Sequence, residues 1–117
     1  MSPLARKLYT QLRKRVVAGQ CSITYKALAK ASGDVHPRSP ALHAALGEVT
    51  NACRHAGLPV LPAIVWKAGT NRPSTGYYKV AHPRAHTDEA KRAAWEKEHA
   101  KVIGDPSVYP ASLELGL

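Results

Sequence analysis

The segment LPVLPAIVWKAGTNRPSTGYYKV, residues 58–80, decides how the rest of the chain is interpreted. Two runs rich in β-branched and aromatic residues, 60–66 and 76–80, flank a stretch rich in Gly, Asn and Pro. This pattern predicts a β-hairpin with its turn over 67–75. Because Pro62 has no backbone N–H, we expect the first strand to start late or to lie at the edge of a sheet.

The predicted turn is basic, because it contains Lys67 and Arg72 and no acidic residue. The whole chain of 117 residues has 17 Lys and Arg against 8 Asp and Glu, a net charge of +9. Residues 1–80 carry 12 basic and two acidic residues, a balance of +10, whereas residues 81–117 carry five and six. A positive excess confined to one part of a chain favours an anionic partner, and nucleic acid is the commonest one for a small soluble domain.

Three helices are predicted before the hairpin. Apolar residues recur with helical spacing over 2–18, 25–32 and 40–56, and the last of these helices has the clearest apolar stripe. A short β-prone run, 21–25, precedes the second helix. Each helix starts beside a residue that suits the N-cap position, namely Ser2, Thr24 and Ser39.

The order helix, short strand, helix, loop, helix, hairpin is that of a winged helix-turn-helix. We therefore predict an α+β fold that is mainly α, with a three-helix core and a β-hairpin wing over residues 1–82. In such folds the third helix enters the major groove of DNA, which here is helix 40–56. The run 21–25 would pair with the hairpin to make a small three-stranded sheet.

This interpretation divides the polar residues into two groups. The base-reading candidates on helix 40–56 are His43, Thr50, Asn51 and Arg54. The candidates for phosphate contact are Lys26, Lys30, Lys67, Arg72 and Lys79, and Asn71 can reach a phosphate or a minor-groove edge.

The sequence VAGQCSITYKALAKASG, followed by a helix, Leu-Pro, a β-run and Gly-Tyr, gives residues 4–80 a family resemblance. This part resembles the C-terminal, DNA-binding domain of the methylated-DNA–cysteine alkyltransferase and alkyltransferase-like families. Thr24 and Tyr25 match the Thr-Tyr pair that opens the second helix there, and the resemblance implies that Tyr25 approaches a DNA phosphate. Gly76 and Tyr77 resemble the element that closes the family's site.

The reactive motif of that family is missing. The corresponding run LPAIVW, residues 61–66, contains no Cys, His or Arg, and it lacks the Trp-His-Arg variant of the alkyltransferase-like proteins. The resemblance therefore implies a winged helix and DNA contact but no alkyl transfer. The stretch 57–78 also resembles small, uncharacterised winged-helix proteins of bacteria and phages, which implies no particular role.

No catalytic or metal site is predicted, and we expect no cofactor. The six histidines and two cysteines do not follow a zinc-ligand spacing, and Cys53 lies on an apolar stripe, where a thiol is usually inert. A metal-dependent nuclease would need acidic ligands, and residues 35–86 offer only Glu48. A metal-independent RNase built on histidines remains open.

The remainder of the chain is predicted to hold a C-terminal helix within 83–104, capped by Thr87, and an irregular tail over 105–117. The helix could make a homodimer contact or pack on the first helix of a monomer, and we favour the second. Two free thiols and the lack of a signal peptide or membrane-spanning run favour an intracellular, cytoplasmic protein.

The leading hypothesis is thus a non-enzymatic protein that binds double-stranded DNA, for example as a transcriptional regulator. One alternative is a protein-interaction module with the same fold, such as a phage-encoded inhibitor or adaptor, with Trp66, Tyr77 and Tyr78 as interface anchors. Another is RNA or damaged-base binding without chemistry.

Overall fold

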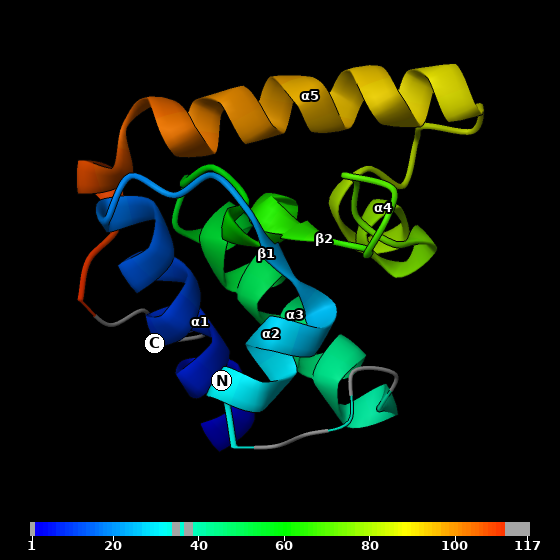
Figure 1. The fold of residues 1–117 in the computed structure, drawn as a ribbon. Coiled ribbons are helices and arrows are strands. Elements are labelled where there is room, and N and C mark those ends of the chain that lie inside the picture. Colours follow the sequence, from blue (N-terminus) through cyan, green and yellow to red (C-terminus); the bar gives the residue numbers. More distant parts are fainter. Residues whose placement is uncertain (1, 34–35, 37–38, 112–117) are drawn as a thin grey trace.

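The computed structural model describes residues 2–33, 36 and 39–111 and has a mainly helical fold with one small sheet (Figure 1). This confirms the predicted class, α+β and mainly α. The elements are, in order, α1 (Pro3–Val17), β1 (Ile23–Thr24), α2 (Tyr25–Ala31), α3 (Pro40–His55), η1 (Leu61–Ile64), β2 (Val65–Trp66), α4 (Thr75–Ala81), α5 (Asp88–Gly104) and η2 (Pro106–Val108), where η denotes a 3-10 helix.

Four helices begin directly after their predicted N-cap residues. The side-chain oxygens of Ser2, Thr24, Ser39 and Thr87 each accept a hydrogen bond from a backbone N–H in the first turn of α1, α2, α3 and α5. Ser2 also ties α1 to α3, because its N–H and hydroxyl donate to the carboxylate of Glu48 at 3.0 and 2.7 Å. These two hydrogen bonds lower the pKa of Glu48.

One hydrophobic core joins α1, α3 and η1. The apolar stripe of α1, including Leu8 and Leu12, packs against the stripe of α3 and against the fully buried Leu61 and Ile64 of η1. Cys53 lies inside this core, and its burial raises the pKa of the thiol to about 11. The prediction that Cys53 is a packing residue is confirmed.

The predicted β-hairpin is wrong in its second strand. Residues 75–81 form α4, and β2 pairs instead with β1 as a two-stranded parallel sheet, with Ile23 opposite Val65. The predicted three-stranded sheet is corrected accordingly. Tyr77 and Tyr78 are both buried, whereas successive residues of a strand point to opposite faces. A helix lets both rings pack on the protein, and this burial outweighs their β-propensity.

The C-terminal helix α5 lies across the top of the other elements in Figure 1 and packs mainly on η1. Trp95 donates its indole N–H to the carbonyl of Ala63 at 2.9 Å, and Glu98 accepts the N–H of Val60 at 2.8 Å. The buried Val102 joins the same core. The expectation that this helix packs on α1 is therefore wrong, while a dimer contact through it stays a prediction.

Residues after α5, rather than α5 itself, cover α1. Tyr109 is buried, and its hydroxyl donates to the carbonyl of Pro59 at 2.7 Å. Tyr9 and Arg13 of α1 donate to the carbonyls of Pro110 and Tyr109 at 2.6 and 3.0 Å. The predicted irregular tail thus begins with the short helix η2, and Tyr109 and Pro110 after it accept hydrogen bonds from α1. Residues 112–117 lie outside the described part.

Within the described ranges, none of the helices combines the length and the apolarity needed to cross a bilayer.

Candidate nucleic-acid interface

The exposed side of α3 is a continuous arc of the helix. Its buried side consists of the residues that face α1 and η1, and the opposite side leaves Ala44 and Asn51 exposed near its middle. His43 and Arg54 are exposed at the edge of this arc that borders α4. Ala44 and the half-buried Gly47 are small residues on this side, and the half-buried Glu48 lies beside Ala44 and Asn51 at helical spacing.

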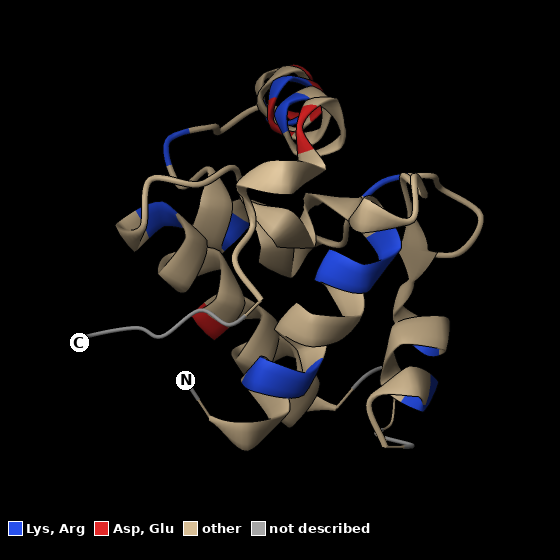
Figure 2. Cartoon of the chain, turned by 90° about the vertical axis from the view of Figure 1, so that its left-hand side faces the viewer, with Lys and Arg blue, Asp and Glu red and all other residues tan. Residues whose placement is uncertain are grey.

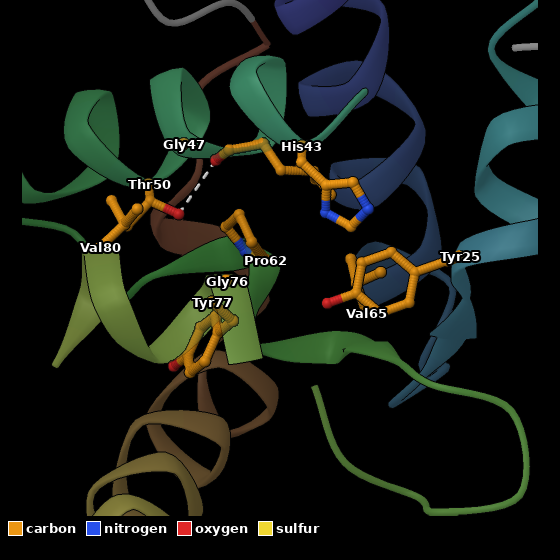
Figure 3. A pocket seen from close by; sticks show the side chains of 10 residues that line it. Tyr25, His43, Gly47, Thr50, Pro62, Val65, Gly76, Tyr77 and Val80 are labelled. Atoms are coloured by element: carbon orange, nitrogen blue, oxygen red, sulfur yellow. Dashed lines mark hydrogen bonds between the residues drawn. The ribbon is translucent and has the colours of Figure 1, made fainter. Parts of the chain in front are cut away.

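The prediction that Thr50 reads bases is wrong. It is only 2% exposed, because α4 covers this position, and its hydroxyl donates to the carbonyl of Leu46 at 3.0 Å (Figure 3). Arg54 is also engaged, since its guanidinium donates to the carbonyl of Val80 at 3.0 Å near the end of α4. Arg54 therefore fixes α4 to α3, while Asn51 makes no side-chain hydrogen bond within the part of the chain that the structure describes.

A chain of side-chain contacts links α3 to the basic turn. The ring of His43 lies on the ring of Tyr25, with centroids 5.5 Å apart. The Tyr25 hydroxyl in turn accepts from the backbone N–H and the hydroxyl of Ser74, both at 3.0 Å. Ser74 is the residue immediately before α4. Tyr25 therefore holds the end of the turn beside α3, with its hydroxyl oxygen accepting both hydrogen bonds.

The basic turn is short and well defined. Lys67 and Arg72 form an isolated antiparallel bridge, with the N–H of Lys67 donating to the carbonyl of Arg72 at 2.7 Å. The Thr70 hydroxyl donates to the carbonyl of Lys67 at 2.8 Å and accepts the N–H of Arg72 at 3.3 Å. Asn71 has a φ of 54°, a left-handed conformation that Asn adopts more readily than most residues.

The other predicted phosphate contacts are exposed on two elements. Lys26 and Lys30 lie on α2, and Lys79 lies on α4. Figure 2 shows most of the acidic positions on α5, whereas many Lys and Arg lie on other elements. Among the residues that the structure describes, Glu48 is the one acid before α5, and Ser2 occupies its carboxylate. The positive charge of the first 80 residues is thus largely uncompensated.

A small pocket opens between α2, α3 and α4 (Figure 3). The rings of Tyr25 and His43 form one wall, Tyr77 and Val80 lie opposite, and Pro62 lies between them. The sequence signal for this pocket was present, because Tyr25, Gly76 and Tyr77 carry the resemblance described above. The described residues that line it include no cysteine, and the run 61–66, which would hold the reactive motif of the resembled family, contributes Pro62 and Val65.

Tyr77 connects this pocket to the half-buried His82. Its hydroxyl lies 2.9 Å from Nε2 of His82, and burial raises the pKa of Tyr77. Burial also lowers the pKa of His82. This pair was not predicted from the sequence, because the two residues were placed in a strand and in the loop after it.

Comparison of the chain with models of protein families, with curated proteins and with solved structures finds no match. The site therefore has to be judged on its own geometry. Among the described residues, no three His, Cys, Asp or Glu side chains come close enough to hold a metal ion.

Proposed function

We propose that this protein binds double-stranded DNA without chemistry, as a compact variant of the winged helix. The exposed arc of α3 would lie in the major groove, with Asn51 near its centre as the base-reading residue. The turn 67–72 would serve as a shortened wing on the phosphate backbone. In this variant α4 replaces the second strand of the wing.

The observation that carries the proposal is the contact chain from His43 through Tyr25 to Ser74. These two successive contacts join the turn that carries Lys67 and Arg72 to the edge of the α3 arc. A recognition helix and a cationic loop that act on one duplex need such proximity. The charge balance of +10 in residues 1–80 supports the same partner, because phosphate neutralisation supplies most of non-specific affinity.

A salt series tests the proposal. Fluorescence anisotropy with a labelled random duplex should show a log–log slope of about −4 to −7, for about five to eight neutralised phosphates. The double variant Lys67→Gln with Arg72→Gln should flatten the slope by about 2. The matched control is Lys97→Gln with Lys101→Gln, which removes the same charge from α5 and should leave the slope within about 0.5.

Two results would count against DNA binding. If the wild type does not bind the duplex even at low salt, the protein-interaction alternative takes the lead. If the double variant on α5 flattens the slope as much as the double variant in the turn does, the affinity reflects overall charge, and the turn does not act as a wing. Asn51→Ala should lower affinity for a preferred sequence and leave random-duplex binding nearly unchanged, because base contacts carry sequence preference.

A second candidate function is supported by the pocket in Figure 3. Its aromatic walls, Tyr25 and Tyr77, lie at the edge of the α3 arc, where they would stack on an unstacked base. Its volume of about 50 Å³ is smaller than a base, so these walls would have to move apart to admit one. This is the alternative of damaged-base binding without chemistry. Duplexes with one mismatched base pair should then bind at least about tenfold tighter than the matched duplex, since extrusion of a base costs a few kcal/mol less there. Equal affinities would exclude it.

A further inference from the structure

A hollow outside the α3 arc combines three cationic side chains. It lies between the basic turn, the start of α4 and the first half of α5, and it is lined by Lys67, Arg72 and Lys91, with Ser74, Thr75 and Tyr78. Lys91 comes from the C-terminal helix, which the sequence interpretation kept apart from the DNA-binding unit. Within the described ranges, no salt bridge pairs any of the three cations with a carboxylate.

The turn forces two of these cations together. Lys67 and Arg72 are directly opposite in an antiparallel bridge, so their side chains leave the same face, where like charges destabilise each other. The hydrogen bonds of the Thr70 hydroxyl fix this arrangement from within the turn. Because the backbone keeps these two like charges close together, an anion bound between them would relieve their repulsion.

The hollow also contains one carboxylate, Asp88, which leaves its lining with a net positive charge. Asp88 lies in the first turn of α5, where the helix dipole favours a carboxylate, so it has a structural reason to be there. The hydroxyl group of Thr75 adds a neutral donor to the lining, whereas the hydroxyl of Ser74 already donates to Tyr25. Three cations with a neighbouring hydroxyl donor suit the oxygens of a phosphate group.

We propose that this hollow binds one phosphodiester group of the duplex backbone, and that Lys91 is its third cation. The inference deepens the proposed function and rests on it. It extends the interface from the turn onto α5, and it gives the C-terminal helix a direct role in DNA binding in place of a purely structural one.

The test compares Lys91→Gln with Lys97→Gln, a matched change on the same helix outside the hollow. With a random duplex, Lys91→Gln should flatten the log–log salt slope by about 0.9, which is about an eightfold loss of affinity at 0.1 M salt. Lys97→Gln should keep the wild-type slope. Equal slopes for the wild type and Lys91→Gln would overturn the inference while DNA binding itself stands.

A second measurement does not depend on DNA binding. Titration with inorganic phosphate, followed by backbone-amide NMR, should shift the amide signals of Thr70, Thr75 and Lys91 in the wild type and much less in Lys91→Gln. If phosphate shifts these signals but the wild type does not bind the duplex, the hollow stands with free phosphate as its source, and the proposed function fails. If phosphate does not shift them, or if the shifts are the same in Lys91→Gln, the assignment of Lys91 to the site is overturned.

Discussion

Tyr25→Phe is the most direct perturbation of the geometry on which the proposed interface depends. It removes one oxygen and keeps the ring that lies on His43. The lost atom accepts two hydrogen bonds from Ser74, both at 3.0 Å. Each such bond contributes about 0.5–1.5 kcal/mol net, and Ser74 is half-buried, so water can replace part of the loss. We therefore expect a destabilisation of about 1–2 kcal/mol.

This cost converts to a measurable shift in Tm. At about 2.1 cal/mol/K of unfolding entropy per residue, 117 residues give about 250 cal/mol/K. A loss of 1.5 kcal/mol then lowers Tm by about 6 °C. Differential scanning calorimetry measures it, and urea unfolding at 25 °C gives an independent value of the free energy.

The matched control is Tyr78→Phe. Tyr78 is buried, whereas Tyr25 is half-buried, and the Tyr78 hydroxyl makes no hydrogen bond with another described residue. Its loss should therefore change Tm by no more than about 1 °C. If Tyr25→Phe also leaves Tm within about 1 °C, the hydroxyl does not hold Ser74, and Tyr25 does not fix the turn beside α3. A fall in Tm shared equally by both variants would refute it as well.

Further predictions concern α5, the thiols and the half-buried His82. Trp95→Phe removes the hydrogen bond to η1 and part of a buried ring, and it should cost about 1–3 kcal/mol in urea unfolding; a neutral result would mean that α5 is not part of the cooperative unit. A thiol reagent should label Cys21, which is exposed, within minutes, and Cys53, which is buried with its pKa raised to about 11, only after unfolding; two fast thiols in the native protein would contradict the core. Because burial lowers the folded-state pKa of His82, the unfolded chain takes up the proton first, so stability is full above about pH 6.5 and falls as the pH drops below it. The fall in the urea midpoint between pH 7.5 and 5.5 should be smaller in His82→Gln, and an unchanged fall would show that other groups cause it.

The parts of the fold that depend on local chemistry were predictable from the sequence. An N-cap is decided by a residue and its next three neighbours, and the starts of α1, α2 and α3 at Ser2, Thr24 and Ser39 were correct for that reason. The apolar stripe of α3 was correct because helical periodicity is a property of the segment itself.

The errors came from contacts between distant residues. Tyr77 and Tyr78 have high β-propensity, but their burial against the rest of the chain selects a helix. The parallel pairing of Ile23 with Val65 joins segments more than 40 positions apart, and nothing within either segment encodes the direction. Thr50 failed as a site residue for the same reason, since α4, which covers it, was expected to be a strand.

Because residues 75–81 form α4 instead of the predicted second strand, the basic turn is held differently from the tip of a hairpin. In a free hairpin the tip is supported by its own two strands, whereas here one end of the turn follows the β1–β2 pair and the other end is fixed to Tyr25 through Ser74. The turn is therefore ordered before any ligand arrives, and binding does not have to supply the entropy of ordering it. For an interface of this kind, the number of cations aimed at phosphate, rather than the folding of a loop, sets the affinity. If Lys67, Arg72 and Lys91 contact phosphate, removing any of them must flatten the salt dependence of the affinity.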